Sequence, residues 1–141
     1  VPPYIISAYF DFITSSYPMD WNLLTGIRIN DPVVFVVGEQ FLEMPGLNAN
    51  TNTFIYSLAG GGIIQYFKSM ITVALVFGFL DMRYESSRNP MLIFVGFLYA
   101  ILITEQAATT ALVSSGVALL LIFTSLAEEG AENKAHSAIE Y

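Results

Sequence analysis

Glu105 is the residue of this chain whose type and position most favour chemistry. It is the single charged residue in the apolar stretch 91–127, and Gln106 follows it. Burial of a carboxyl group in such surroundings would raise its pKa and favour the protonated form. Glu105 is therefore a candidate buried carboxylate that could bind or relay a proton or a cation. The alternative is a helix-surface acid that pairs with a neighbouring subunit or with Lys68, the candidate counter-charge.

Other reaction chemistry has little support in the sequence. The chain has no cysteine and one histidine, His136 in the polar tail, so paired-ligand zinc or haem sites are not expected. Gly60–Gly62 lie inside an apolar element and do not follow a strand, unlike the glycines of a nucleotide-binding loop. We expect a protein that is not an enzyme and has no cofactor.

The composition indicates a membrane protein or a protein that is assembled like one. Of 141 residues, 55% are hydrophobic and 12% are charged, and the mean hydropathy is +0.60, above the range of most soluble domains. Without long basic runs, nucleic acid is not expected as the main ligand. Residues 1–53 carry about minus four charges and the tail 128–141 about minus three, whereas residues 54–127 are about neutral.

The stretch 91–127 predicts one long buried helix. Asn89 is a good N-cap and Pro90 suits the first helical position. At about 1.5 Å per residue the helix would extend over roughly 55 Å, beyond the hydrocarbon core of about 30 Å. Three interpretations fit this length: two short spans broken near Glu105, one span continuing into a partner, or a helix buried by other subunits. Since residues 105–111 hold no turn chemistry, we expect a continuous helix.

Small side chains recur along this predicted helix at steps of four and three residues, which would place them on one face. Such a face lets two helix backbones approach closely, although small residues are also simply tolerated in apolar helices. The predicted packing seam consists of Thr104, Ala108, Ala111, Ser115 and Ala118.

A second apolar helix is expected over residues 54–80, with Thr51, Asn52 or Thr53 as its cap. Its run of three glycines predicts a kink, a break or a close backbone contact. The polar connection 81–90 is short enough to make the two helices antiparallel neighbours. It holds the hairpin-loop residues Arg83, Arg88, Asn89 and Pro90.

The segment 1–53 is expected to be irregular, aromatic and acidic. Within it, residues 5–13 could form a short amphipathic helix, residues 32–38 read as a short strand, and residues 41–44 could add a helical turn. The fold class is therefore all-α: a hydrophobic antiparallel helical hairpin of two long apolar helices, 54–127, after the N-terminal segment 1–53 and before the acidic tail 128–141.

A hairpin with an Arg-Asn-Pro loop and an acid midway along its second helix resembles the proteolipid ring subunits of rotary ATPases. The matching positions are Arg88, Asn89, Pro90, the run FVGFLYAIL and Glu105, and the resemblance implies proton or cation transport at Glu105. The chain departs from that family in its first helix, where the glycine-rich inner ring would meet the large residues Tyr66, Phe67, Lys68, Phe77 and Phe79. The chain is therefore not assigned to it.

Our leading hypothesis is a non-catalytic structural subunit, processed or exported, whose apolar helices pack against copies of itself as in a pilin-like filament or a virion coat. Burial of apolar surface would drive this assembly at about 25 cal/mol per Å². Lipid is a further expected partner. The alternatives are an accessory subunit bound to the larger subunits of a respiratory or photosynthetic membrane complex, and a proton or cation carrier.

The expected location is a membrane or an extracellular or virion assembly. Arg83 and Arg88 would be cytoplasmic, with both termini on the other side.

Overall fold

The computed structural model describes residues 2–16, 22–26, 31–124 and 126, and in these residues all regular structure is helical. Six helices follow one another: α1 Pro3–Ser16, α2 Asn22–Thr25, α3 Val33–Gln40, α4 Thr53–Ser87, α5 Pro90–Leu102 and α6 Ala108–Val113. Residues 117–124 are helical as well. The predicted tail 128–141 lies outside the described residues.

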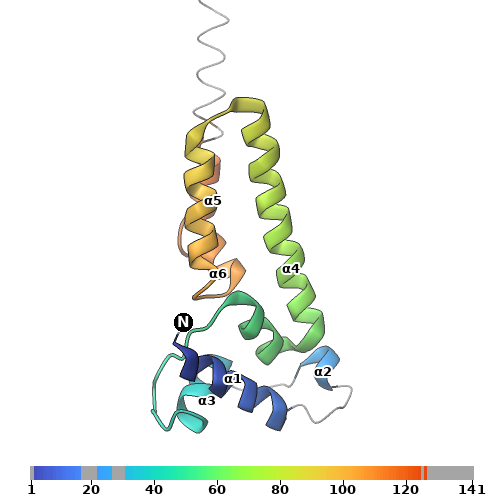
Figure 1. Cartoon of the computed structure of the whole chain (residues 1–141), viewed down its shortest axis with the longest axis vertical. Helices are drawn as coiled ribbons and strands as arrows, with labels where there is room; N and C mark the ends of the chain where they lie inside the picture. Colours follow the sequence, from blue (N-terminus) through green and yellow to red (C-terminus); the bar gives the residue numbers. More distant parts are fainter. Residues whose placement is uncertain (1, 17–21, 27–30, 125, 127–141) are drawn as a thin grey trace, which may run out of the picture.

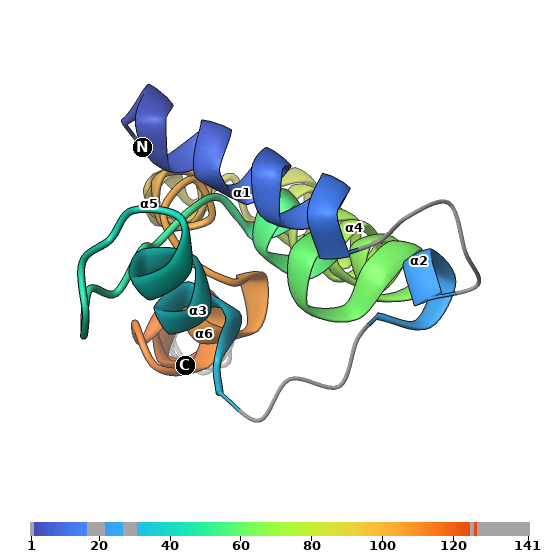
Figure 2. The ribbon, with the colours of Figure 1, turned by 90° about the horizontal axis from the view of Figure 1, so that it is seen from below.

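The fold has a hairpin and a base (Figure 1). Helices α4 and α5 run antiparallel as the two arms of the hairpin. The chain then turns at the base through α6 and runs back along α5 with residues 117–124. Helices α1, α2 and α3 lie across the base, as the view from below shows (Figure 2). The described chain therefore makes three passages along the hairpin axis rather than the two that were expected.

The first arm, α4, is kinked where the sequence has its three glycines. Its N-cap Asn52 accepts hydrogen bonds from the backbone N–H groups of Phe54 and Ile55. Gly62 has φ 64° and ψ −161°, a conformation that is essentially open to glycine alone. The backbone of Gly26 comes so close to the helix here that a Cβ on Gly26 would lie 2.6 Å from the Cα of Gly61. The predicted kink and the predicted close backbone contact are both confirmed.

The turn between the arms is shorter than the predicted polar connection 81–90. Helix α4 continues to Ser87, and Arg88 ends it in the left-handed conformation with φ 54°. Asn89 caps α5 by accepting a hydrogen bond from the Met91 N–H, and Pro90 occupies the first turn. The expected start of the second apolar helix is confirmed, and the polar residues before it extend α4 instead of forming a loop.

The prediction of one continuous helix over 91–127 is wrong. Helix α5 ends at Leu102, residues 103–107 form a turn, and α6 is followed by a second turn in which Gly116 has φ 80°. Thr53 holds the first turn in place: its N–H donates to the Ile103 carbonyl oxygen at 2.9 Å, and its hydroxyl donates to the Gln106 carbonyl oxygen at 2.6 Å. Polar groups from α4 thus satisfy the backbone that the helix break exposes.

The base contains three helices, so the N-terminal segment is less irregular than expected, and residues 41–52 are the longest described part of it that forms no helix. The predicted strand 32–38 is the helix α3, which follows Pro32 and buries Val33, Val34 and Val37. The predicted helical turn at 41–44 is absent, because α3 ends at Gln40. The expected amphipathic helix at 5–13 is confirmed within α1, which buries Ala8, Tyr9 and Phe12.

Two separate cores hold the molecule together. In the base, the phenol of Tyr9 is fully buried and donates a hydrogen bond of 2.9 Å to the Ala49 carbonyl oxygen. That core contains Ala8, Tyr9, Phe12, Val33, Val37, Ala49 and Ala59. In the hairpin, α4, α5, α6 and the helix of residues 117–124 share a second core of Val76, Leu80, Leu92, Val95, Tyr99, Ala111 and Val117.

Candidate functional site

A polar cavity of about 430 Å³ lies where α4 faces the start of α6. Its polar wall is supplied by one lysine, one amide and several hydroxyl groups, with backbone and methyl groups from the start of α6 opposite. The residues that line it are Tyr56, Ser57, Gln65, Lys68, Ser69, Ile71, Thr72, Ala107, Ala108 and Thr109. Polar side chains are thus gathered on the base side of the uncharged run 69–80 of α4.

The kink at Gly62 builds the floor of this cavity. It folds the first turns of α4 back so that Ser57 and Ser69, both buried, share a hydrogen bond of 2.6 Å between their hydroxyl oxygens. One turn further on, the hydroxyl of Thr72 donates to the Lys68 carbonyl oxygen at 2.9 Å. Each hydroxyl has one donor and two acceptor positions, so these serine and threonine oxygens can still accept hydrogen bonds.

Among the described residues of the cavity wall, Lys68 is the one that carries a charge. Its side chain is exposed, and no aspartate or glutamate is among the lining residues. A cavity with one ammonium group, hydroxyls and no carboxylate is suited to an anionic group, because the cation offers three N–H donors and a compensating charge.

Glu105 and Lys68 are not shown as a pair. Glu105 lies in the turn after α5, where its side chain is exposed and its N–H donates to the Leu102 carbonyl oxygen at 3.1 Å. The expected burial of this carboxylate is therefore absent from the structure. The neighbouring Gln106 is used locally, since its side-chain amide donates a 2.7 Å hydrogen bond to the Ser115 hydroxyl.

The five residues of the predicted packing seam lie on different elements. Ala108 and Ala111 are buried on α6, Ala118 is half-buried on the helix of residues 117–124, and Thr104 and Ser115 are exposed in the two turns. The hydroxyl of Thr104 donates to the Ile101 carbonyl oxygen at 2.6 Å. The two buried alanines pack inside this chain, so these five side chains do not share one helix face.

The hairpin-loop residues lie at the opposite end of α4 from the polar cavity. The Arg88 guanidinium lies over the ring of Tyr84, 5.6 Å from its centroid, and Arg83 is half-buried one helical turn before Ser87, whose hydroxyl donates to the Arg83 carbonyl oxygen. Asn89 and Pro90 serve the start of α5, as described above. Arg88, Asn89 and Pro90 thus form the turn, whereas Arg83 lies within α4.

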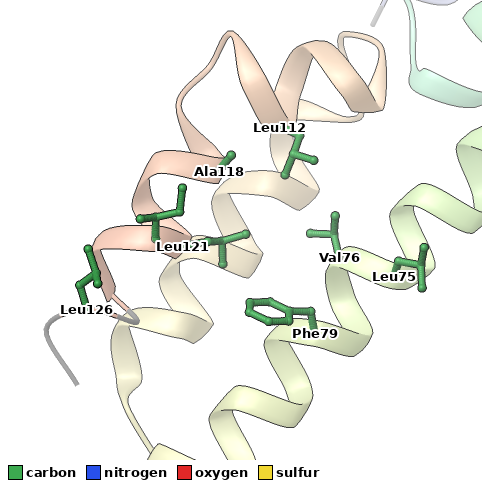
Figure 3. Close-up of a pocket in the computed structure, with 8 residues that line it drawn as sticks. Leu75, Val76, Phe79, Leu112, Ala118, Leu121 and Leu126 are labelled. Carbon is green, nitrogen blue, oxygen red and sulfur yellow. The ribbon is translucent and has the colours of Figure 1, made fainter. Parts of the chain in front are cut away.

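A second cavity, of about 480 Å³, is apolar. It lies between α4 and residues 117–126 and is lined by Leu75, Val76, Phe79, Leu112, Ala118, Leu121, Ile122 and Leu126. Figure 3 shows Leu121 pointing across the gap toward Val76 and Phe79, with Leu112 at one end. Such a space favours hydrocarbon and excludes polar ligands.

A metal centre has no donor set in the part of the chain that the structure describes, where no three His, Asp or Glu side chains are grouped to hold an ion. His136 lies outside that part. In the base, burial raises the pKa of the Tyr9 phenol above its usual range, and the neighbouring Tyr56 raises it further. The protonated phenol keeps the hydrogen that it donates to the Ala49 carbonyl oxygen.

The comparisons with known proteins give no family for this chain. No protein family matches it, and no curated protein and no solved structure is significantly similar to it. The site must therefore be interpreted from its own residues.

The polar cavity was missed by the sequence interpretation, which singled out Lys68 only as a counter-charge for Glu105. The signal was present: Gln65, Lys68, Ser69 and Thr72 recur at three- and four-residue steps and so share one face of α4. Ser57 could not be added to them from spacing, because only the kink at Gly62 brings it to Ser69.

Proposed function

We propose that this chain is a non-catalytic structural subunit of a membrane, anchored by α4, α5 and residues 117–126. One observation carries the proposal: the apolar side chains of the hairpin face outward. In the described residues α4 is the one helix long and apolar enough to cross a membrane, and only 17% of its most apolar window is buried. The core helix of a soluble protein would be mostly buried, whereas a helix in lipid keeps an apolar exterior.

The exposed apolar side chains come from all three passages of the hairpin. Leu75 on α4 is 68% exposed, Phe97 on α5 is 65% exposed, and Phe123 on the third passage is 65% exposed. The other large exposed apolar side chains of these passages include Phe67, Ile71, Phe79, Met82, Ile93, Phe94, Ile101, Leu119, Ile122 and Leu126. An exterior of this extent would cause aggregation in water and is stabilised in hydrocarbon.

The ends of the apolar region carry cations and tyrosines, as membrane interfaces do. Lys68 and Tyr66 lie toward the base, and Arg88 and Tyr84 lie at the turn between the arms. Tyrosine rings and long cationic side chains both suit the level of the lipid headgroups. With the two arginines at the turn on the cytoplasmic side, the acidic base with Glu39 and Glu43 would lie on the opposite face of the membrane.

A second candidate is the self-assembling subunit of a filament or coat. It is favoured because the uncharged helical segments are shorter than the hydrocarbon core of a membrane is thick. Residues 63–87 extend over about 37 Å, but the uncharged run 69–80 covers only about 18 Å and α5 about 20 Å. A hydrocarbon core of about 30 Å exceeds these two lengths. If neighbouring copies of the chain cover the outward apolar side chains, the helices no longer need to match the thickness of the hydrocarbon core. The accessory subunit of a larger complex would remove it in the same way, with unrelated chains as neighbours.

The test is to isolate membranes from cells that express the chain and to extract them at alkaline pH. The proposed subunit stays in the membrane pellet, and release into the supernatant would contradict a membrane anchor. The retained material is then solubilised in mild detergent and its mass and composition are measured. A filament or shell of this chain alone would favour the second candidate, and a fixed ratio to other chains would favour an accessory subunit.

A further inference from the structure

The polar and the apolar cavities follow one another along the same face of α4. Lys68 and Thr72 line the polar cavity, and Leu75, Val76 and Phe79 line the apolar one. These positions are three or four residues apart, so they form one stripe on the helix surface.

The opposite wall continues in the same way. Ala108 and Thr109 at the start of α6 face the polar cavity, and Leu112 near the end of α6 faces the apolar one. The two cavities therefore lie in line, polar toward the base and apolar toward the turn between the arms, and together they are called the amphipathic groove below.

We propose that this groove binds one anionic phospholipid. The phosphate group lies at Lys68, where the ammonium donates hydrogen bonds to it, and an acyl chain lies along Val76, Phe79 and Leu121. Lysine is a common phosphate ligand. Among the described residues that line the two cavities none is acidic, so none of these side chains repels the phosphate.

The arrangement of the groove favours a lipid over a soluble anion. From Lys68 to Phe79 the stripe extends over about 16 Å, and beyond the first turns its lining consists of hydrocarbon. A free phosphate would use the polar end and leave the apolar end empty. The inference relies on the proposed membrane location only for the supply of lipid, since the groove belongs to the chain itself.

Native mass spectrometry of the full-length chain in detergent tests the headgroup contact. The probes are phosphatidylglycerol and phosphatidylcholine with identical acyl chains. The wild-type chain should bind phosphatidylglycerol about tenfold more tightly, because the choline cation of phosphatidylcholine already compensates the phosphate charge that pairs with Lys68. Lys68→Gln should abolish this preference and Lys68→Arg should keep it. Arg88→Gln is the matched control, because it removes the same charge at the other end of α4.

The apolar contact is tested by filling the groove. Ala118 lines it, so Ala118→Phe should weaken the binding of both lipids. Leu119→Phe should not, because Leu119 is 57% exposed and absent from the lining. Inorganic phosphate in excess should fail to displace the lipid, and its success would reduce the site to a simple anion site.

Equal binding of the two lipids by the wild-type chain, or an unchanged preference in Lys68→Gln, would overturn the inference. Circular dichroism of each variant establishes that it is folded before binding is measured. Because binding is measured in detergent, its failure is separate from failure of the membrane proposal. A chain that stays in alkaline-washed membranes but shows no headgroup preference would retain the anchor and lose the lipid site.

Discussion

The hydroxyl oxygens of Ser57 and Ser69 lie 2.6 Å apart on the two sides of the kink at Gly62. If α4 were straight, Ser57 and Ser69 would lie more than three helical turns apart and their hydroxyl groups could not meet. This hydrogen bond places Lys68 and Thr72 opposite the start of α6, where the polar cavity forms. The kink therefore determines where the polar and apolar parts of the hairpin meet.

Gly62→Ala should destabilise the protein because alanine is strained at φ 64° and ψ −161°. Strain of this kind costs about 1–3 kcal/mol, measured as a lower free energy of unfolding in detergent. Gly78→Ala is the control: no atom lies within 4 Å of a Cβ placed there, and alanine favours a helix by about 1 kcal/mol. Equal stability of the two variants would mean that α4 is not kinked at Gly62.

Ser57→Ala and Ser69→Ala should each destabilise the chain by about 1–3 kcal/mol, because each leaves the other buried hydroxyl without this partner. The double variant should lose less than the sum of the two single losses, since it leaves no orphaned hydroxyl at this contact. A double-mutant cycle from chemical unfolding measures this. Strict additivity would show that the two hydroxyls do not interact.

Tyr9 should make the stability of the base depend on alkaline pH. Burial holds its pKa above the usual value of 10.0 in the folded chain, so the unfolded chain releases this proton first as the pH rises. The contribution of Tyr9 to the free energy of unfolding should not change with pH below about pH 10 and should fall above it. Tyr9→Phe should weaken this fall, whereas Tyr4→Phe, which alters an exposed tyrosine, should not.

At neutral pH the same Tyr9→Phe substitution should cost about 1–3 kcal/mol, because the Ala49 carbonyl oxygen loses the Tyr9 donor. Thermal unfolding followed by circular dichroism at pH 7 and pH 11 gives both values. An identical pH dependence in the wild type and Tyr9→Phe would show that the phenol is not buried.

The helix boundaries that are determined by a capping side chain or a proline could be predicted from the sequence. Asn52 and Asn89 have side chains that cap the following helices, and Pro90 fits the first turn of α5. The glycine run also predicted a kink, although not which glycine adopts the positive φ. In each case the determining contact lies within a few residues of the chain.

The failures have tertiary causes. The valines of α3 favour a strand by their β-branched shape, but burial of Val33 and Val37 against α1 and α4 decides for a helix. The break after Leu102 contains no turn residues, and it is stabilised by Thr53, whose hydrogen bonds reach it from far along the chain. Neither of these long-range contacts can be inferred from the local preferences of the residues. The polar cavity was missed for the same reason, because Ser57 meets Ser69 only through the kink.

The central claim is that the outward apolar side chains of the hairpin face lipid. The chain has no cysteine, so single-cysteine variants at Leu75, Phe97 and Glu39 can carry a nitroxide spin label. After reconstitution into vesicles, the accessibility of each label to oxygen and to a water-soluble nickel chelate is measured. High oxygen and low nickel accessibility at positions 75 and 97, with high nickel accessibility at the exposed position 39 of the base, is the predicted result. Low accessibility to both reagents at 75 and 97 would indicate burial in protein neighbours, and high nickel accessibility there would contradict the membrane account.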